Sequence, residues 1–364
     1  MEYKKIGDLT NVITGGTPPT AKPEYWDNGD IPWLQSGCCQ DCDVDFAEKY
    51  ITQEGYDNSS TKLMPKDSVM IALTGATAGK IGYLNFEACG NQSITGILPC
   101  GLMNQRYLFY FLLSQREKIL ADCIGGAQPH ISQGYVKNIY VPVLSLEKQK
   151  EIVDTLSCLS GIINKRRDEI RLLDNFIKAR FVEMFSDPVA NDMGWDTLPL
   201  ENVCKAIVDC PHSTPSYTNE DTGFMCIRTS IVKKNKILWD DIEYISEDEF
   251  AKRIQRKKPE VGDIVYTREG AILGIAAIID RDCNVALGQR SMLLSPDIDK
   301  CTSEFLCVAM NSDSFFDNAL KGISGSASPH INVGDIKAFR MIMPPIELQN
   351  QFADFVHQVT KSKF

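Results

Sequence analysis

The sequence lacks the long apolar segments of membrane and secreted proteins. Its longest apolar run, Ala271 to Ile279, is far shorter than the roughly 18 residues of a membrane helix, and the N-terminus, MEYKKIGDLT, has no apolar signal core. The thirteen cysteines show no disulfide-like rhythm. We therefore expect a cytoplasmic protein with buried, reduced thiols and no contact with a membrane.

Motifs of common enzyme classes are missing as well. The chain contains no G-x-S-x-G, H-E-x-x-H, G-x-G-x-x-G or N-P-P-Y motif. Residues 74–80 resemble a phosphate-binding loop. However, Gly75 and Gly79 are one residue closer together than that motif requires, and Ile81 stands where the motif has the Ser or Thr that holds magnesium. Cys39 and Cys42 form one C-x-x-C without the second ligand pair of a structural zinc site. We expect no catalytic centre, metal or cofactor in this chain.

An excess of positive charge is also absent, since the formal net charge is −10. This balance argues against a protein that binds nucleic acid through its overall charge. Any DNA contact would need local patches or a basic partner, and local runs are equally typical of solvated loops. The candidate patches are Lys233, Lys234 and Lys236, and the run Arg253, Arg256, Lys257 and Lys258.

What the sequence does contain is an internal duplication. GGAQPHIS at 125–132 returns as GSASPHIN at 325–332, so that His130 and His330 lie 200 positions apart. An E-x-Q helix start follows each copy, with Gln149 and Gln349 as its last residue. A period of this length is typical of duplicated domains rather than of a solenoid. Further equivalent pairs upstream are Gly75 and Gly270, Gly79 and Gly274, and Gln92 and Gln289.

Each copy has the pattern of a β-rich domain. Short apolar runs predict strands at 68–73, 80–84 and 139–143, and at 263–266, 272–279 and 340–343. Amphipathic spacing predicts one helix in each copy, over 104–121 and 303–319. We expect the duplicated glycines in tight turns with positive φ.

A heptad pattern lies between the two copies, interrupted by Arg166 and Arg180. A helix over 147–185 would span about 58 Å, too long to bury its apolar stripe against one small domain. A shorter helix 200 positions later supplies a partner. We therefore expect an α+β fold in which two similar β-rich domains are joined by long helices that form an antiparallel coiled coil. The predicted seam residues are Ile152, Leu156, Leu159, Ile163, Ile170, Leu173, Ile177, Met184, Phe352, Val356 and Val359.

His130 and His330 are the duplicated histidines of the chain. A duplicated histidine can be a catalytic base, yet no duplicated nucleophile or acid accompanies it. It can also cap a strand end as a structural residue, or contact DNA. The sequence leaves these readings open.

Several segments in combination resemble the specificity subunits of bacterial type I restriction-modification systems, over essentially the whole chain. Singly each is weak, and together they are specific. They are ITGGTPPT (13–20), EYWDNGDIPW (24–33), the duplicated PHI and E-x-Q motifs, MFSDPVANDMGW (184–195), HSTPSY (212–217) and YTREGAILG (266–274).

The resemblance implies a non-catalytic subunit with two target-recognition domains, 1–145 and 187–345, each reading one half of a bipartite double-stranded DNA site. It implies two antiparallel helices, 146–186 and 346–364, as spacer and as docking surface for two modification subunits. Those subunits would carry S-adenosylmethionine, and restriction subunits are a further class of partner. The C-terminal helix is shorter than in this pattern. A duplicated protein-binding scaffold without DNA recognition is the alternative that the acidic charge suggests.

Base readout needs side chains with two donors or acceptors on rigid loops. We expect Arg268 to be the strongest reader, because an arginine on a turn can meet guanine. Lys233 and Lys234 are expected phosphate contacts. The other candidates are Gln35, Ser36, Thr74, Thr77, Lys80, Gln92, Gln128 and His130 in the first domain, and Arg228, Thr229, Glu269, Gln289, Arg290, Ser328 and His330 in the second.

Overall fold

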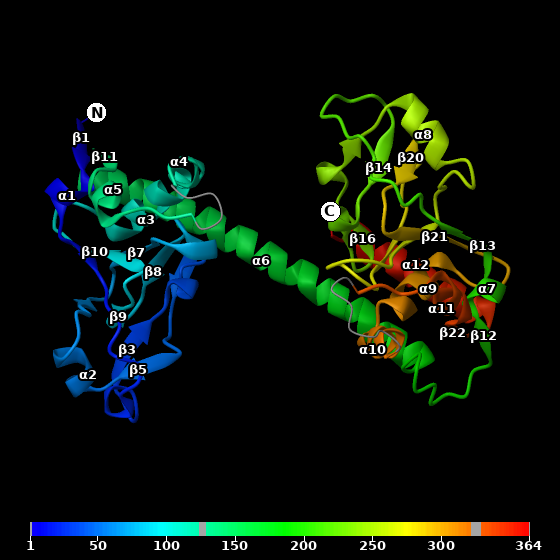
Figure 1. Ribbon diagram of the computed structural model, residues 1–364, viewed down its shortest axis with the longest axis horizontal. Coiled ribbons are helices and arrows are strands. Elements are labelled where there is room, and N and C mark those ends of the chain that lie inside the picture. The colour runs from blue at the N-terminus through cyan, green and yellow to red at the C-terminus, as the bar shows by residue number, and fades with distance from the viewer. Residues whose placement is uncertain (1, 124–128, 322–328, 364) are drawn as a thin grey trace. The chain divides into compact units, whose positions relative to one another are not determined.

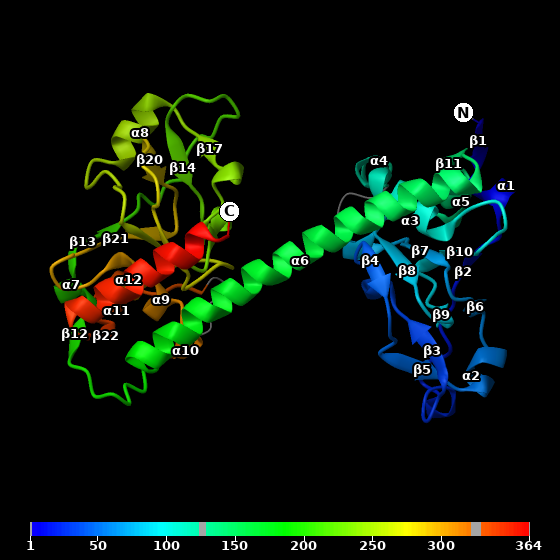
Figure 2. The same ribbon diagram turned by 180° about the vertical axis from the view of Figure 1, so that it is seen from behind.

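The computed structural model describes residues 2–123, 129–321 and 329–363 (Figures 1 and 2). Two compact units divide the chain, Met1–Lys165 and Arg166–Phe364. Helix α6 (Leu146–Phe185) continues across this boundary, so each unit combines one β-rich domain with part of α6. Each unit contains both a β-rich domain and helical residues. The predicted division into two domains and two separate helical segments stays a prediction.

The first unit is built on two main sheets and one small one. The larger has the strand order β2-β10-β7-β8-β4, the second β5-β3-β9-β6, and β1 pairs with β11. Its elements are β1 (Glu2–Lys5), α1 (Ile6–Leu9), β2 (Val12–Thr14), β3 (Ile31–Leu34), β4 (Cys42–Val44), β5 (Lys49–Ile51), α2 (Gln53–Asp57), β6 (Leu63–Met64), β7 (Val69–Ala72), β8 (Ile81–Leu84), β9 (Ala88–Gly90), β10 (Ile94–Ile97), α3 (Gln105–Ser114), α4 (Arg116–Ala121), α5 (Gln133–Lys137) and β11 (Tyr140–Val143).

The second unit has sheets of strand order β13-β21-β18-β19 and β17-β14-β20, with the pairs β12-β22 and β15-β16. Its elements are β12 (Thr197–Pro199), α7 (Leu200–Val203), β13 (Cys204–Asp209), β14 (Met225–Ile227), β15 (Val232–Lys233), β16 (Lys236–Ile237), β17 (Glu243–Tyr244), α8 (Glu247–Arg253), β18 (Ile264–Thr267), β19 (Ala276–Ile278), β20 (Val285–Leu287), β21 (Ser291–Pro296), α9 (Ser303–Met310), α10 (Asp313–Leu320), α11 (Val333–Ala338), β22 (Arg340–Ile342) and α12 (Ile346–Lys361).

The same topology occurs in both units. The order β2-β10-β7-β8 returns as β13-β21-β18-β19, and β5-β3-β9 returns as β17-β14-β20. Even the parallel pairing of β3 with β9 is repeated by β14 with β20. The predicted duplication is therefore confirmed as two copies of one α+β domain.

Two predicted helices each divide into two shorter ones. The helix expected over 104–121 becomes α3 and α4, because Gln115 leaves helical geometry at φ −93° and ψ 5°. The helix expected over 303–319 becomes α9 and α10, because the Ser312 hydroxyl accepts a hydrogen bond from the Phe315 amide and starts a new helix. Apolar periodicity continues across both breaks, so it could not reveal them.

The two E-x-Q glutamines hold each unit together at its long-helix start. Gln149 and Gln349 are both 0% exposed. The Gln149 amide oxygen accepts from the Asn104 backbone N–H at 2.7 Å, and that of Gln349 from Thr302 N–H at 3.1 Å. Their amide groups donate to the Leu144 and Pro344 carbonyls, at 2.8 Å in each case. Each glutamine thus joins the start of α6 or α12 to the start of α3 or α9.

In the second unit, α6 and α12 pack antiparallel. Phe181 contacts Phe352, and Phe176, earlier in α6, contacts Phe355, later in α12, with ring centroids 5.5 and 5.0 Å apart. Arg166 reaches the Ser362 carbonyl near the end of α12. Within this stretch the predicted seam residues Leu173, Ile177, Met184, Phe352, Val356 and Val359 pack against the core.

The seam does not continue as predicted into the first unit. Ile152 packs against the core of the first domain, which includes residues of α3. Leu156, and Ile170 in the second unit, are half-buried. Leu159 and Ile163 are each 50% exposed. These two predicted seam residues therefore lie on the exposed surface of α6. The heptad pattern also did not identify Phe181 and Phe185, which are fully buried.

Candidate nucleic-acid interface

In each domain one short turn connects the two main sheets, and the predicted reading residues surround it. This linking turn comprises residues 91–93 between β9 and β10, and residues 288–290 between β20 and β21. Asn91 N–H donates to the Leu34 carbonyl at 2.9 Å, and Gly288 N–H donates to that of Ile227 at the same distance. The glutamine that follows, Gln92 or Gln289, is thereby fixed beside the end of β3 or β14.

Two predicted pairs lie directly beyond these strand ends. Gln35 and Ser36 follow β3, and Arg228 and Thr229 follow β14. In both domains the second residue of the pair begins a 3-10 turn, Ser36–Cys38 or Thr229–Ile231. The equivalence that the sequence suggested for these residues is therefore a structural one.

A second strand end reaches the linking turn from the other sheet. Leu73 N–H donates to the Ser93 carbonyl at 2.8 Å, and Arg268 N–H donates to that of Arg290 at 3.0 Å. The next residue in the first domain, Thr74, donates from its hydroxyl to Ser93 Oγ at 2.9 Å. Thr77 lies in the following 3-10 turn, and Lys80 Nζ donates to Gln40 Oε1 at 2.6 Å.

The duplicated glycines adopt the positive φ that the sequence predicted. The φ angles are 77° and 72° at Gly75 and Gly79, and 88° and 71° at Gly270 and Gly274. A Cβ atom at Gly79 would lie 2.8 Å from Ile119, and one at Gly274 would lie 2.8 Å from Phe316. Both conformation and space therefore require glycine at the second position.

The PHI segments add to the same end of each domain. Ile131 N–H donates to the Leu73 carbonyl and Ile331 N–H to that of Arg268, both at 2.9 Å. His130 and His330 are exposed, bridged through their backbones to Thr74 and Glu269. This pairing gives the motif a structural role without deciding what the side chains do. Gln128 and Ser328 lie outside the described residues.

Basic candidates of the second domain are largely paired with carboxylates. Arg228 lies 2.9 Å from Glu243, and Lys234 lies 2.8 Å from Asp313. Lys233 donates to the carbonyl of Ser230. These side chains would have to exchange partners in order to contact DNA.

Arg268 differs most from its sequence-based expectation. It is 5% exposed, and its guanidinium donates to both carboxylate oxygens of Asp209 at 2.9 and 3.2 Å. It also lies 2.9 Å from Glu269, itself a predicted reader. Because two carboxylates already accept from its guanidinium, Arg268 holds the turn in place as a buried side chain. Its contact with a base stays a prediction.

Arg290 has the properties expected of Arg268. It is exposed, and among the described residues no carboxylate pairs with it. Its φ of 72° is unusual for a residue with a side chain, and such strain persists where the surrounding structure requires it. We rank Arg290 above Arg268 as a reader.

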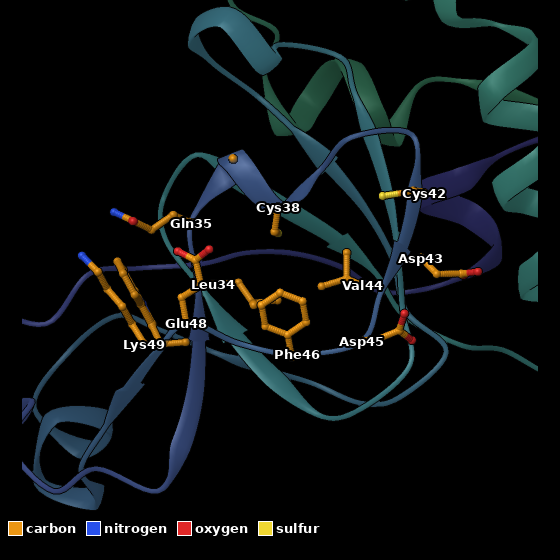
Figure 3. A pocket seen from close by; sticks show the side chains of 12 residues that line it. Leu34, Gln35, Cys38, Cys42, Asp43, Val44, Asp45, Phe46, Glu48 and Lys49 are labelled. Carbon is orange, nitrogen blue, oxygen red and sulfur yellow. The ribbon is translucent and has the colours of Figure 1, made fainter. Parts of the chain in front are cut away.

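A cavity of about 390 Å³ borders Gln35 in the first domain (Figure 3). Gln35 and Lys49 lie along one side, Asp43 and Asp45 along the other, and Phe46 between them is 71% exposed. The carboxylates of Asp43, Asp45 and Glu48 outnumber the single lysine in its lining, so the cavity is poorly suited to bind a phosphate backbone.

The described residues contain no group of three or more side chains suited to a metal ion. All thirteen cysteines are free thiols, and burial raises the pKa of Cys204 and of Cys226 to about 12. Such thiols are unreactive at neutral pH. In the described part of the chain no helix has the length and apolar character needed to cross a membrane.

A protein-family model, the type I restriction modification DNA specificity domain, matches residues 1–172 and again 193–364. The chain belongs to this type I specificity family. The EcoR124I/EcoR124II specificity subunit of Escherichia coli is 30% identical over 45% of this chain and 42% of that protein. The MjaIX specificity subunit of Methanocaldococcus jannaschii is 22% identical over 98% of this chain and 85% of that protein.

A solved structure shares the fold of this family member. The S subunit of a type I restriction-modification system from M. genitalium superposes with a TM-score of 0.54 at 15% identity, over 100% of this chain and 90% of that chain. The α+β architecture with two specificity domains and a long helix is therefore shared.

Sequence reasoning did not identify two kinds of residue at this site. Thr17 and Thr214 donate hydrogen bonds to Gln92 and Gln289, and the repeated Thr-Pro dipeptide was the available signal. Asp209 binds Arg268 across 59 positions. No local sequence pattern predicts that Asp209 is the partner of Arg268.

Proposed function

We propose that this chain is the non-catalytic DNA-recognition subunit of a type I restriction-modification complex. Each domain would read one half of a bipartite double-stranded DNA target through the residues around its linking turn. The long helices would set the spacing and dock two modification subunits that supply S-adenosylmethionine and methyl transfer. Restriction subunits would be further partners.

The observation that carries this proposal is the repetition of one polar site in two domains. Gln35, Gln92 and His130 surround the first linking turn, and Arg228, Gln289, Arg290 and His330 surround the second. Amide and guanidinium groups on loops anchored to strand ends suit base edges in a groove. Duplicated sites fit a target with two halves.

The acidic balance is consistent with this division of labour. Phosphate contacts supply much of the affinity of DNA-binding proteins, and here most candidate cations are paired internally. We infer that the partner subunits provide the phosphate contacts, while this chain provides the sequence readout.

The test is to express this gene with its partner modification gene in a methylation-free host and to map methylated adenines by single-molecule sequencing. We expect one bipartite motif with an unspecified spacer between two defined halves. Methylation that is absent, or present without any motif, would contradict the proposal. If the chain assembled with its cognate modification subunits retards no duplex even at low salt, the scaffold alternative is favoured.

Arg290→Ala tests the second half-site. We expect the assembled complex to bind its mapped target about 1–3 kcal/mol more weakly, with relaxed discrimination at one position of that half. Melting of the chain should change little, because Arg290 is exposed. Lys205→Ala, another exposed cation of the second domain that lies outside the candidate patches, serves as the matched control. Equal binding by both variants and the parent would remove Arg290 from the interface.

A further inference from the structure

A threonine contacts the linking-turn glutamine in both domains. The Thr17 hydroxyl donates to Gln92 Oε1, and the Thr214 hydroxyl donates to Gln289 Oε1 at 2.8 Å. The two threonines lie 197 positions apart, as do the two glutamines. The pair is thus part of the duplicated design, although the surrounding loop sequences, GGTPPT and HSTPSY, differ.

Buried contacts hold the loop that carries each threonine in place. Pro18 and Pro215, the residues that follow, are both buried. The carbonyl of the preceding residue accepts a hydrogen bond from a buried side chain in each domain. In the first domain the Trp33 indole donates to Gly16 at 3.0 Å, and in the second the Arg253 guanidinium donates to Ser213 at 2.7 Å.

Two unrelated side chains therefore hold the same carbonyl. Arg253 was a candidate surface cation by sequence, yet it is 7% exposed, lies 2.8 Å from Glu249, and also donates to Leu287. In one domain an indole and in the other a guanidinium binds the carbonyl that precedes the threonine. The two domains therefore share the position of the threonine rather than the side chain that holds its loop.

The hydrogen bond selects one end of the glutamine amide. A carboxamide carries an acceptor oxygen and an NH₂ group with two donors. With Oε1 engaged by the hydroxyl, the NH₂ group remains available, and within the described residues it makes no hydrogen bond in either glutamine. Gln92 is exposed and Gln289 half-buried, so a ligand can reach both.

We propose that Thr17 and Thr214 are positioning residues that present the donor end of Gln92 and Gln289 to a hydrogen-bond acceptor of DNA. The inference rests on the proposed function and names the chemistry of its site. The acceptor is either a base edge, such as purine N7, guanine O6 or thymine O4, or a phosphate oxygen.

The test removes the hydroxyl while keeping the shape. In Thr17→Val the Gln92 amide is free to turn over and to offer its oxygen to donor groups. We expect discrimination at one position of the first half-site to fall about tenfold, with the second half-site unchanged. Thr214→Val should do the reverse, so each variant is the control for the other. Thr17→Ser keeps the hydroxyl and should retain the parental motif.

Gln92→Glu provides a second variant that acts on the presented group rather than on the loop. The threonine still holds one oxygen, and an acceptor replaces the donor. We expect at least about tenfold weaker binding to the mapped target, with unchanged melting of the chain.

The readout is competitive binding of the assembled complex to the mapped duplex and to duplexes altered at each position. Relaxation at one base position identifies a base edge as the acceptor, whereas equal weakening on all duplexes identifies a phosphate. If the parent is selective and the valine variants keep its affinity and motif, this inference alone is overturned, whatever the effect of Gln92→Glu. A parent complex that prefers no duplex overturns the proposed function as well.

Discussion

Arg268→Ala is expected to lower the free energy of unfolding of the second unit by about 3–5 kcal/mol, the usual cost of leaving a buried charge without its partner. The Arg268 side chain is 6% exposed and that of Asp209 17%. Removing the guanidinium takes away the group that pairs with both Asp209 and Glu269, and leaves Asp209 with His212, 3.2 Å away. Urea unfolding followed by pulsed hydrogen exchange measures the effect in each unit separately.

A double variant separates anchoring from DNA reading. Arg268→Ala with Asp209→Ala removes both charges, and it should recover part of the lost stability, since the partly buried carboxylate of Asp209 no longer remains without its arginine. If Arg268→Ala instead unfolds like the parent but loses target binding, the base contact predicted from the sequence is right. The same measurement therefore decides between the two roles.

Phe352→Ala should destabilise the second unit by about 3–5 kcal/mol, as expected for a large aromatic removed from a packed core. Phe352 is 0% exposed, and its ring lies 5.5 Å from those of Phe181 and Phe185. These contacts attach α12 to α6, so the variant should also loosen the helix pair. Hydrogen exchange in α12 and in residues 170–185 provides the readout.

Phe176→Ala is the matched control for this variant. Phe176 is 54% exposed and contacts Phe355 at a centroid distance of 5.0 Å, so its loss should cost about 1 kcal/mol. Similar costs for both variants would mean that α12 is not part of the second core. Because the helix pair is the proposed docking surface, Phe352→Ala should additionally weaken capture of the modification subunit.

Features that depend on residues close together in the sequence were predictable from it. The repeat predicted two copies of one domain because equivalent motifs fold alike. The glycines at 75, 79, 270 and 274 predicted turns because only glycine adopts positive φ without strain. Strands such as β7, β8 and β18 lay close to their predicted runs, because a buried strand is a short apolar segment.

Features that depend on distant partners were not predictable. Leu159 and Ile163 fit the heptad pattern as well as Ile177 does. They are half exposed, whereas Ile177 is buried in the core cluster that also contains Phe352 of α12. The splits at Gln115 and Ser312 arose from backbone geometry and a cap within periodic segments.

The sequence alone therefore determined the family, the duplication and the regions of each domain that carry polar loops. Tertiary structure decided which polar groups in those loops remain available. Arg268 and Arg290 are both arginines near one turn, but only Arg268 meets Asp209, 59 positions away. Availability depends on desolvation and on a partner brought close by folding, and neither is encoded in the neighbouring residues.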